Sequence, residues 1–366
     1  MSKILELCSQ LNIGGAQAVA AAIGLHAPQG IRVDYLVFSD REGDYEADLT
    51  ARGCRIHHWP APSGGQLRYL RKLTALLRRE RYDAVHCHNM FSAGTVMLAG
   101  FLAGVPCRIA HSHTTREECA DTISRRFYRW VMRRLIHLFG TEFFACGVAA
   151  GNTLYGEGWF AKHGTLIPNG IDTAAYGFSP NVRKAIREAC GLRDAFVIGH
   201  VGHYVGVKNQ SFLIDLMPRL LELRPDAVLL LFGEGQDRAM LTQRIQALNL
   251  TDRVRLMGNV RNIGQILSAF DVFAFPSLFE GTPLALLEAQ ANGLCCIISD
   301  SIPTDAIVTD DVHPLPLDAD LWLPALASAR RTGTEDQSHI LLQKYESIHD
   351  SMTRIYTVVN QYQKDR

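Results

Sequence analysis

The sequence predicts an α/β protein built from two Rossmann-like domains. Short apolar runs alternate with amphipathic segments along the chain, and this alternation restarts in the second half. Strands that alternate with helices form a parallel sheet with helices on both faces. The 366 residues are too many for one ordinary core and enough for two domains.

The elements of the first half follow in order. Ile4–Cys8 is predicted to be a strand, followed by a glycine pair and an alanine-rich helix from about Ala16. Ile31–Phe38 is the next expected strand, and Leu67–Arg81 carries apolar residues at helical spacing. Further short strands, each before a helical pattern, are expected at Ala84–Cys87, Arg108–His111 and Phe143–Cys146.

The second half repeats this order. The expected elements are strand Ala195–Val201, helix Gln210–Leu223, strand Ala227–Phe232, helix Asp237–Leu248, and strands Val254–Met257, Val272–Phe275 and Leu294–Ile298. Between the halves, Ile167–Asp172 holds a proline and an Asn-Gly pair, which break both kinds of periodicity. We therefore place the domains at residues 1–168 and 169–336. A final helix is expected over Gln337–Gln361, in a segment 337–366 that we expect to cross back to the first domain.

Composition argues against several classes of protein. Lys plus Arg equals Asp plus Glu at 37 each, so a general nucleic-acid binder is not expected. Nine cysteines without a Cys-x-x-Cys pair, several of them in apolar runs, are typical of reduced thiols in a cytoplasmic protein. Met1–Cys8 is too short and too interrupted for a secretory leader, and no apolar run approaches the roughly 20 residues of a membrane span.

The segment Ser277–Ala289 is the most informative part of the chain. A strand ends at Pro276 before it, and a helix is expected to start near Pro283. The free N–H groups at such a helix start form an anion site suited to a diphosphate. Glu288 would then bind ribose hydroxyls, and Glu280 lies where a transferred sugar would sit. For either acid alone, a capped helix with surface carboxylates is the favoured interpretation. Taken with the glycine turn and the strand–turn–helix context, the functional interpretation is favoured.

A longer frame, Glu-Gly-x-Pro-x-x-x-x-Glu-Ala, starts at Glu280. It resembles the signature of the family-4 retaining glycosyltransferases, and the closest likeness is to bacterial exopolysaccharide or capsule glycosyltransferases. The resemblance covers nearly the whole chain, through Gly14–Gln17, His86–Asn89, His111–His113, Pro168–Asp172, Gly202–Asn209 and Gly233–Gly235. It implies the GT-B fold, in which two Rossmann-like domains face each other across a cleft. The N-terminal domain would bind the acceptor and the C-terminal domain the nucleotide sugar.

The resemblance also implies a role for each matching residue. In the catalytic set, His113 would sit on the acceptor side, Glu280 would contact the donor sugar and Lys208 would neutralise the departing diphosphate. Within the donor-binding set, Glu288 would bind the ribose, and residues 258–261 would form the base pocket. That set is Gly14, Gly15, His203, Gly233, Val260, Arg261, Gly281, Thr282, Pro283, Leu284 and Glu288.

One position departs from the family pattern. The family has an arginine five residues before the lysine, and this chain has His203 before Lys208. Arginine carries a permanent charge and a fork for phosphate oxygens, whereas histidine changes its charge near neutral pH. We hypothesise that His203 keeps the phosphate contact and makes turnover depend more on pH. The same departure supports an alternative, a transfer-deficient protein that only holds a nucleotide sugar.

The reaction implied by the resemblance is retaining transfer of a sugar from a nucleoside diphosphate, UDP by family habit, to a saccharide or lipid-linked acceptor in surface polysaccharide biosynthesis. We expect a front-face displacement in which the leaving diphosphate takes the acceptor proton. We expect no cofactor, and we expect the reaction to be metal-independent because no Asp-x-Asp metal motif is recognised in the sequence. A nucleotide-sugar epimerase is a further alternative, and the two-glutamate frame argues against it.

Two groups of residues keep two interpretations each. His86 and His88, like His111 and His113, share one face of a strand at alternate positions. Metal binding is conceivable there, but the spacing matches no standard zinc motif, and we expect His86 and His111 to be structural.

Ser124–Arg134 is a basic, aromatic helix candidate. It would bind an anionic membrane at the inner face of the plasma membrane, or pack on its sheet with a solvated arginine face.

Overall fold

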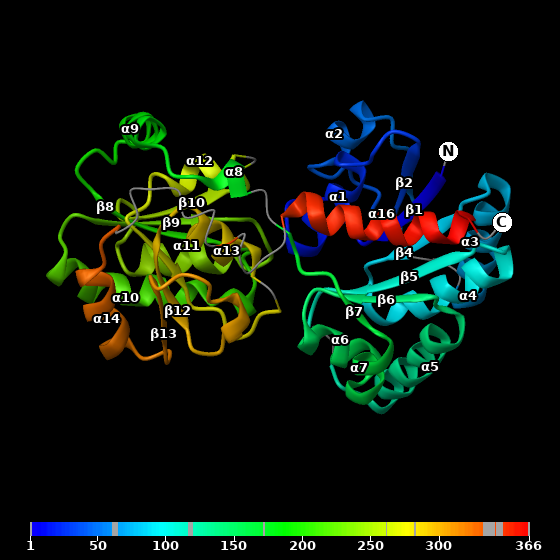
Figure 1. The fold of residues 1–366 in the computed structure, drawn as a ribbon. Helices are drawn as coiled ribbons and strands as arrows, with labels where there is room; N and C mark the ends of the chain where they lie inside the picture. The colour runs from blue at the N-terminus through cyan, green and yellow to red at the C-terminus, as the bar shows by residue number, and fades with distance from the viewer. Residues whose placement is uncertain are drawn as a thin grey trace. The chain divides into compact units, whose positions relative to one another are not determined.

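The computed structural model describes residues 2–60, 65–115, 120–170, 173–260, 262–281, 283–331, 341 and 347–364. The chain forms two compact units (Figure 1). Unit 1 comprises Met1–Gly170 together with Ile348–Arg366, and unit 2 comprises Ile171–Ser347. Within the described ranges, no helix has both the length and the apolar character needed to cross a bilayer.

Unit 1 is organised on a parallel sheet whose described strands run in the order β3-β2-β1-β4-β5-β6-β7. The strands are β1 Ser2–Cys8, β2 Ile31–Val37, β3 Ile56–His58, β4 Ala84–Cys87, β5 Cys107–Ser112, β6 Glu142–Ala145 and β7 Thr165–Leu166. The central strands are buried on both faces, as expected where helices cover both sides of a parallel sheet.

Helices cover both faces of the unit 1 sheet. The described helices are α1 Gly15–Leu25, α2 Glu46–Ala51, α3 Gly65–Glu80, α4 Ala93–Ala103, α5 Ile123–Phe139, α6 Val148–Tyr155, α7 Glu157–His163 and α16 Ile348–Lys364, with the 3₁₀ turn η1 Met90–Ser92. Residues of α3, α4, α5 and α6 pack in one core with alternate side chains of the strands. Residues of α1, α2 and α16 pack in the other, and Figure 1 shows α16 (red) beside α1.

Unit 2 repeats the architecture, with its described strands in the order β10-β9-β8-β11-β12-β13, all parallel. The strands are β8 Phe196–Val201, β9 Ala227–Phe232, β10 Val254–Gly258, β11 Val272–Phe275, β12 Cys295–Ser299 and β13 Val312–Leu315. The described helices are α8 Thr173–Tyr176, α9 Pro180–Ala189, α10 Gln210–Leu223, α11 Arg238–Ala247, α12 Ile263–Leu267, α13 Leu284–Ala291 and α14 Ala319–Ser328, with the 3₁₀ turns η2 Gly206–Lys208 and η3 Thr304–Ala306. Two hydrophobic clusters flank the sheet, one with α10, α11 and α14 and one with α12 and α13.

The predicted fold class, two Rossmann-like domains with parallel sheets, is confirmed. Most expected elements agree with the observed bounds to within two residues, and Gln210–Leu223, Ala227–Phe232 and Val272–Phe275 agree at both ends. The final helix differs from the expectation of Gln337–Gln361. Its described part begins at Ile348 and reaches Lys364, Ser347 is not helical, and residues 337–340 and 342–346 lie outside the described ranges.

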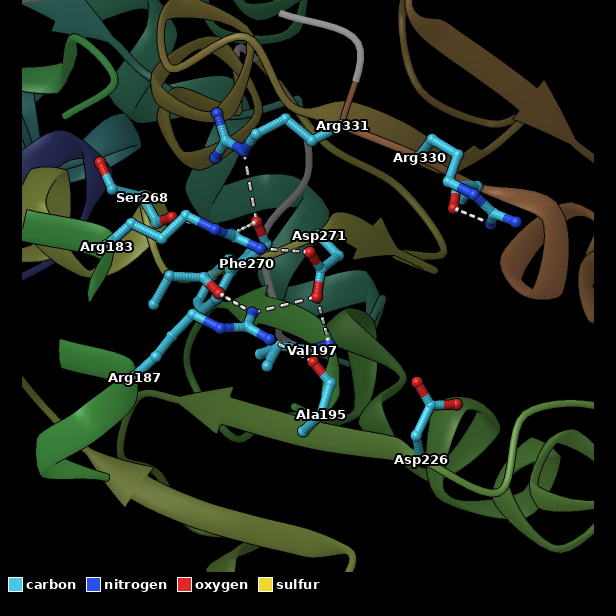
Figure 2. Close-up of polar contacts among 12 residues, drawn as sticks. Arg183, Arg187, Ala195, Val197, Asp226, Ser268, Phe270, Asp271, Arg330 and Arg331 are labelled. Carbon is cyan, nitrogen blue, oxygen red and sulfur yellow. Dashed lines mark hydrogen bonds and ion pairs between the residues drawn. The ribbon is translucent and has the colours of Figure 1, made fainter. Parts of the chain in front are cut away.

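The amino edge of the unit 2 sheet is closed by a network of arginines (Figure 2). Asp271, which immediately precedes β11, lies between two arginines of α9, with Arg183 Nη2 2.5 Å from Oδ1 and Arg187 Nη1 3.1 Å from Oδ2. Its Oδ2 also accepts the N–H of Val197 at 2.7 Å. Arg331 donates to the carbonyl of Asn292 at 2.7 Å, so the segment after α14 is fixed to the same edge. These contacts are structural, and they leave the opposite, carboxyl edge for a ligand.

Candidate active site

The candidate site of unit 2 lies where its central strands end. The loops after β8, β9 and β11 leave the sheet at the same edge because the three strands are parallel. In open parallel sheets ligands bind outside the carboxyl ends of the strands. Four of the donor-site residues expected from the sequence fall in these three loops, namely His203, Gly233, Gly281 and Pro283.

The loops after β8 and β9 fit together through glycines. A Cβ on Gly233, whose φ is +141°, would lie 2.1 Å from the carbonyl oxygen of Gly202, so only glycine fits. The N–H of Tyr204 donates to the carbonyl of Glu234 at 3.0 Å, and Nδ1–H of His203 donates to the same carbonyl at 3.3 Å. The predicted residues His203 and Gly233 therefore lie in one interlocked pair of loops.

Lys208 and Glu280 form the charged centre of the site. Lys208 Nζ donates to Glu280 Oε1 at 2.5 Å, and the two side chains are 19% and 12% exposed. The ammonium also lies 5.2 Å from the ring centroid of Phe275, the last residue of β11. The backbone joins the two loops as well, since Leu278 N–H donates to Val207 O at 2.8 Å. The sequence placed both residues in the site but did not predict that they pair.

Two buried polar residues support the lysine loop from behind. His200 on β8 donates through Nδ1 to Ala274 O at 2.9 Å, and burial lowers its pKa to about 4. A neutral His200 is left with an acceptor nitrogen, and Gln210 Nε2 lies 3.3 Å from it. The same amide donates to His203 O at 2.8 Å, which fixes the loop that carries His203 and Lys208. Sequence reasoning missed both residues, because a polar residue in an apolar strand does not reveal its partner.

Glu288 lies in α13, one turn beyond the helix start at Leu284. Burial raises the pKa of its carboxyl to about 7, and a hydrogen bond with Tyr176 opposes that rise. Tyr176 comes from α8 and was also missed by sequence reasoning. Glu288 is therefore a half-buried carboxyl near a helix N-terminus whose charge changes near neutral pH. Perturbed groups of this kind gather at functional sites, and an ionised carboxylate can accept hydrogen bonds from ligand hydroxyls.

The remaining predicted residues lie as follows. Gly281, Pro283 and Leu284 form the turn into α13, and Val260 follows β10. Gly14 and Gly15 lie at the start of α1 in unit 1, where a Cβ on Gly15 would meet no atom within 4 Å. Crowding by neighbouring protein atoms therefore does not explain why position 15 is a glycine. Arg261 and Thr282, like the Ile171–Asp172 end of the expected domain boundary, lie outside the described residues.

His113 of unit 1 lies just beyond β5 and joins a histidine cluster that sequence reasoning had only half recognised. Its Nε2 is 2.7 Å from Nδ1 of His88, and His88 Nε2 is 2.8 Å from Oε2 of Glu6 on β1. Burial lowers the pKa of His88 to about 4 and that of His113 well below its usual value. Burial raises the pKa of Glu6, but His86 and His88 outweigh this effect and hold it below the ordinary value. Glu6 was not among the site residues predicted from the sequence.

The expectation about metal motifs needs one correction. The sequence does contain an Asp-x-Asp tripeptide, Asp318–Ala319–Asp320. The structure gives it another role: Asp318 caps α14 by accepting the N–H of Asp320 at 2.9 Å, and Asp320 pairs with Arg219 at 2.8 Å. Helix capping explains an Asp at this position without a metal.

Family models match both halves of the chain. One described as "Glycosyl transferase 4-like domain" matches residues 14–170, and one described as "Glycosyl transferases group 1" matches residues 182–316. The chain is 33% identical to the "Putative glycosyltransferase EpsF" of Bacillus subtilis, over 98% of this chain and 96% of that protein.

Two further relatives and one solved structure extend the likeness. The "UDP-Gal:alpha-D-GlcNAc-diphosphoundecaprenol alpha-1,3-galactosyltransferase" of Escherichia coli is 32% identical over 67% of this chain and 65% of that protein. The "Capsular polysaccharide biosynthesis glycosyltransferase CapH" of Staphylococcus aureus is 25% identical over 93% of each. HepE of Anabaena, solved "in complex with UDP-glucose", shares the fold with a TM-score of 0.82 at 20% identity, over 99% of this chain and all of that one.

Proposed function

This chain belongs to the group 1 glycosyl transferases of the GT-B fold, and we propose that it moves a sugar from a nucleoside diphosphate to a saccharide or lipid-linked acceptor with retention of the anomeric configuration. Its relatives include a glycosyltransferase of capsular polysaccharide biosynthesis. The observation that carries the proposal is the Lys208–Glu280 pair at 2.5 Å, in the loops that precede α10 and α13. It combines a cation for a leaving diphosphate with a carboxylate for sugar hydroxyls.

In the proposed reaction the protein positions the partners and stabilises charge. The bond from the anomeric carbon to the diphosphate oxygen breaks, and the acceptor hydroxyl forms the new bond on the same face. Its proton passes to the departing diphosphate. Lys208, His203 and the N-terminus of α13 stabilise the charge that develops there, while Glu280 and Glu288 hold hydroxyls of the sugar and the ribose. No covalent intermediate on the protein is required, and we propose that the reaction is metal-independent.

UDP is the nucleotide that we propose for the donor. The galactosyltransferase relative uses UDP-Gal, and HepE was solved with UDP-glucose. The acceptor of that relative is a sugar on a lipid diphosphate, which supports a lipid-linked acceptor in surface polysaccharide synthesis. We propose that the remaining donor-site residues contact the diphosphate, the sugar and the base. They are Gly14, Gly15, Gly233, Val260, Arg261 and the segment Gly281–Leu284.

A donor screen followed by transfer tests the function. UDP-, GDP- and ADP-sugars are compared by thermal shift, because a ligand that binds the folded state raises its melting temperature. We expect a rise with a UDP-sugar, and transfer to a lipid-linked saccharide in the presence of EDTA, with the product's anomeric proton coupling matching that of the donor. Binding without transfer to any acceptor would favour the nucleotide-sugar-binding alternative, and an inverted product would contradict retention.

We also propose that unit 1 contacts an anionic membrane through α5. Large apolar side chains on this helix are exposed at helical spacing: Ile123 is 87%, Phe127 65% and Trp130 56% exposed. Arginines flank this stripe, and the guanidinium of Arg134 lies 5.8 Å from the ring centroid of Trp130. Apolar residues beside basic ones match the interface of an anionic bilayer, where a lipid-linked acceptor resides.

Flotation with vesicles tests the membrane contact. We expect the protein to float with vesicles rich in phosphatidylglycerol, and less so as salt rises, because salt screens the arginines. The double substitution Phe127→Ser with Trp130→Ser is expected to abolish flotation. Leu223→Ser serves as the control, because Leu223 is an equally exposed apolar residue (56%) on α10 of unit 2. Equal flotation with neutral phosphatidylcholine vesicles would contradict the proposal.

The thiols support a cytoplasmic setting. None of the eight cysteines in the described ranges forms a disulfide, and seven of them are buried. A reducing compartment preserves such thiols. We therefore propose that the protein acts in the cytoplasm, at the inner face of the plasma membrane.

A further inference from the structure

One buried carboxylate, that of Glu6, contacts a cluster of four histidines in unit 1. The cluster consists of His86, His88, His111 and His113. Glu6 on β1 lies directly opposite His86 in the register of β1 and β4. Side chains alternate along a strand, so His88 follows on the same face, and β5 continues that face with His111 and His113. Glu6, His86 and His111 are fully buried, and His113 is half-buried beyond the end of its strand.

Two chains of hydrogen bonds start from this carboxylate. In the first, His88 Nε2 is 2.8 Å from Glu6 Oε2, and His88 Nδ1 is 2.7 Å from His113 Nε2. In the second, His86 Nδ1 is 3.2 Å from Glu6 Oε1, and His86 Nε2 is 3.2 Å from His111 Nδ1. The ring centroids of His88 and His113 are 5.0 Å apart, as expected for rings that meet end to end.

The hydrogen bonds determine the tautomers of His88 and His113, whose lowered pKa values keep them neutral. An ionised carboxylate only accepts, and a neutral imidazole has one donor and one acceptor nitrogen. His88 must donate its Nε2–H to Glu6, so its Nδ1 accepts Nε2–H from His113. The outer nitrogen of His113, Nδ1, is then a bare acceptor.

Neither His113 Nδ1 nor His111 Nε2 has a hydrogen-bond partner among the described residues, although both are buried. Asn169, which follows β7, interacts with His113, and its own Oδ1 is also a buried acceptor without a described donor. His113 lies just beyond β5, near the carboxyl edge of the sheet, where ligands of parallel sheets bind. A sugar hydroxyl is a donor that would satisfy its Nδ1.

We propose that Glu6 is a positioning residue that acts through His88 to hold His113 in its Nε2–H tautomer, so that His113 Nδ1 accepts a hydrogen bond from a sugar hydroxyl. This inference rests on the proposed function for the role of His113 in the site. A histidine in the other tautomer would present an N–H in the same place, so the hydroxyl would have to accept a hydrogen bond instead of donating one.

The tautomer is measured directly on the complete protein. With ¹⁵N-labelled histidine, long-range proton–nitrogen spectra distinguish a protonated ring nitrogen from a bare one, and His113→Gln assigns the signal. We expect a bare Nδ1 on His113 in the wild type. A protonated Nδ1 would overturn the proposal without any variant. Zinc bound stoichiometrically by His86, His88 and His111, whose ligand atoms lie within 4.8 Å of one another, would overturn it too.

Substitution separates positioning from folding. Glu6→Met removes the acceptor of both hydrogen-bond chains at similar volume. We expect a mixed His113 tautomer and a kcat/KM for the acceptor that is lower by up to about tenfold, and by no less than about twofold, as for the loss of one hydrogen bond. Glu6→Asp keeps a carboxylate and is expected to restore part of both. Asp34→Leu is the matched control, because Asp34 is an equally buried carboxylate in the same sheet that bonds Tyr82 rather than a histidine.

The outcomes are distinguishable from failure of the proposed function. If Asp34→Leu reduces transfer as much as Glu6→Met, or if the His113 tautomer is unchanged in Glu6→Met, the positioning role is wrong. If the wild type transfers no sugar from any donor, the proposed function is wrong, and the tautomer of the wild type still decides whether Glu6 orients His113.

Discussion

We expect Lys208→Met to lower kcat about 100- to 1000-fold, the usual effect of removing one group that stabilises charge on a reacting oxygen. Methionine keeps the length of the side chain and removes its charge. The ammonium is half-buried and lies within 2.5 Å of Glu280, so it acts in a region that is shielded from solvent. Steady-state transfer kinetics measure the effect, and isothermal titration of UDP measures the accompanying loss of affinity for the leaving group.

Controls separate this role from simple support of Glu280. Lys184→Met, an exposed lysine on α9 of the same unit, is expected to change kcat by less than about twofold. Glu280→Gln should lower transfer but leave UDP affinity nearly unchanged, because Glu280 is proposed to hold the sugar. If Lys208 only neutralised Glu280, combining Lys208→Met with Glu280→Gln would recover the activity lost in Lys208→Met alone. Such recovery would contradict a contact with the diphosphate.

Glu288→Gln is expected to weaken UDP binding about 10- to 100-fold, since hydrogen bonds to a charged group contribute about 1.5–3 kcal/mol. Ribose hydroxyls donate to the ionised carboxylate, so binding favours that form and draws the raised pKa of Glu288 downward. UDP binding near pH 6.5 should therefore release protons. Titration calorimetry in buffers of different ionisation enthalpy detects the release, and Glu288→Gln should abolish it. Unchanged release in that variant would place the coupled group elsewhere.

The same carboxyl makes stability depend on pH. Its folded-state pKa of about 7 lies above the unfolded 4.5, so between these values the folded protein binds more protons than the unfolded chain. The contribution of Glu288 is fully present below pH 4.5 and is lost as pH rises to 7, by at most about 3 kcal/mol. Urea unfolding from pH 5 to 8 should show a shallower decline for Glu288→Gln than for the wild type. Glu222→Gln, on the exposed side of α10, should follow the wild type.

Periodicity predicted the central strands because they are uninterrupted apolar runs. The strands that sequence analysis missed, β3, β7 and β13, lie at or next to the edges of their sheets, contain two to four residues each and are partly exposed. β13 also contains Pro314, which removes a hydrogen-bond donor and occurs mainly in edge strands. Such strands are defined by the neighbour they pair with, which no local pattern records.

The same distinction applies to the candidate site. Glu280 and Glu288 could be found because they fall in one strand–turn–helix segment. The pairing of Lys208 with Glu280 joins residues 72 positions apart, and it follows only once β8 and β11 are known to be neighbours. Glu6 gave one local signal, an acid within an apolar strand. Its partners, 80 and 82 residues away, depend on the adjacency of β1 and β4.

The position of α16 has a consequence for the order in which the protein matures during translation. Met352, Ile355, Tyr356 and Val359 are buried in the core that the first strand and helix of the chain also build. Each such side chain contributes about 1.5–3 kcal/mol when buried. The ribosome therefore releases the beginning of the polypeptide long before the residues that complete its core emerge, and unit 2 is synthesised whole in between. A nascent chain that stops before Ile348 leaves an apolar surface of unit 1 uncovered, so unit 1 alone, produced as residues 1–170, lacks part of its own interior.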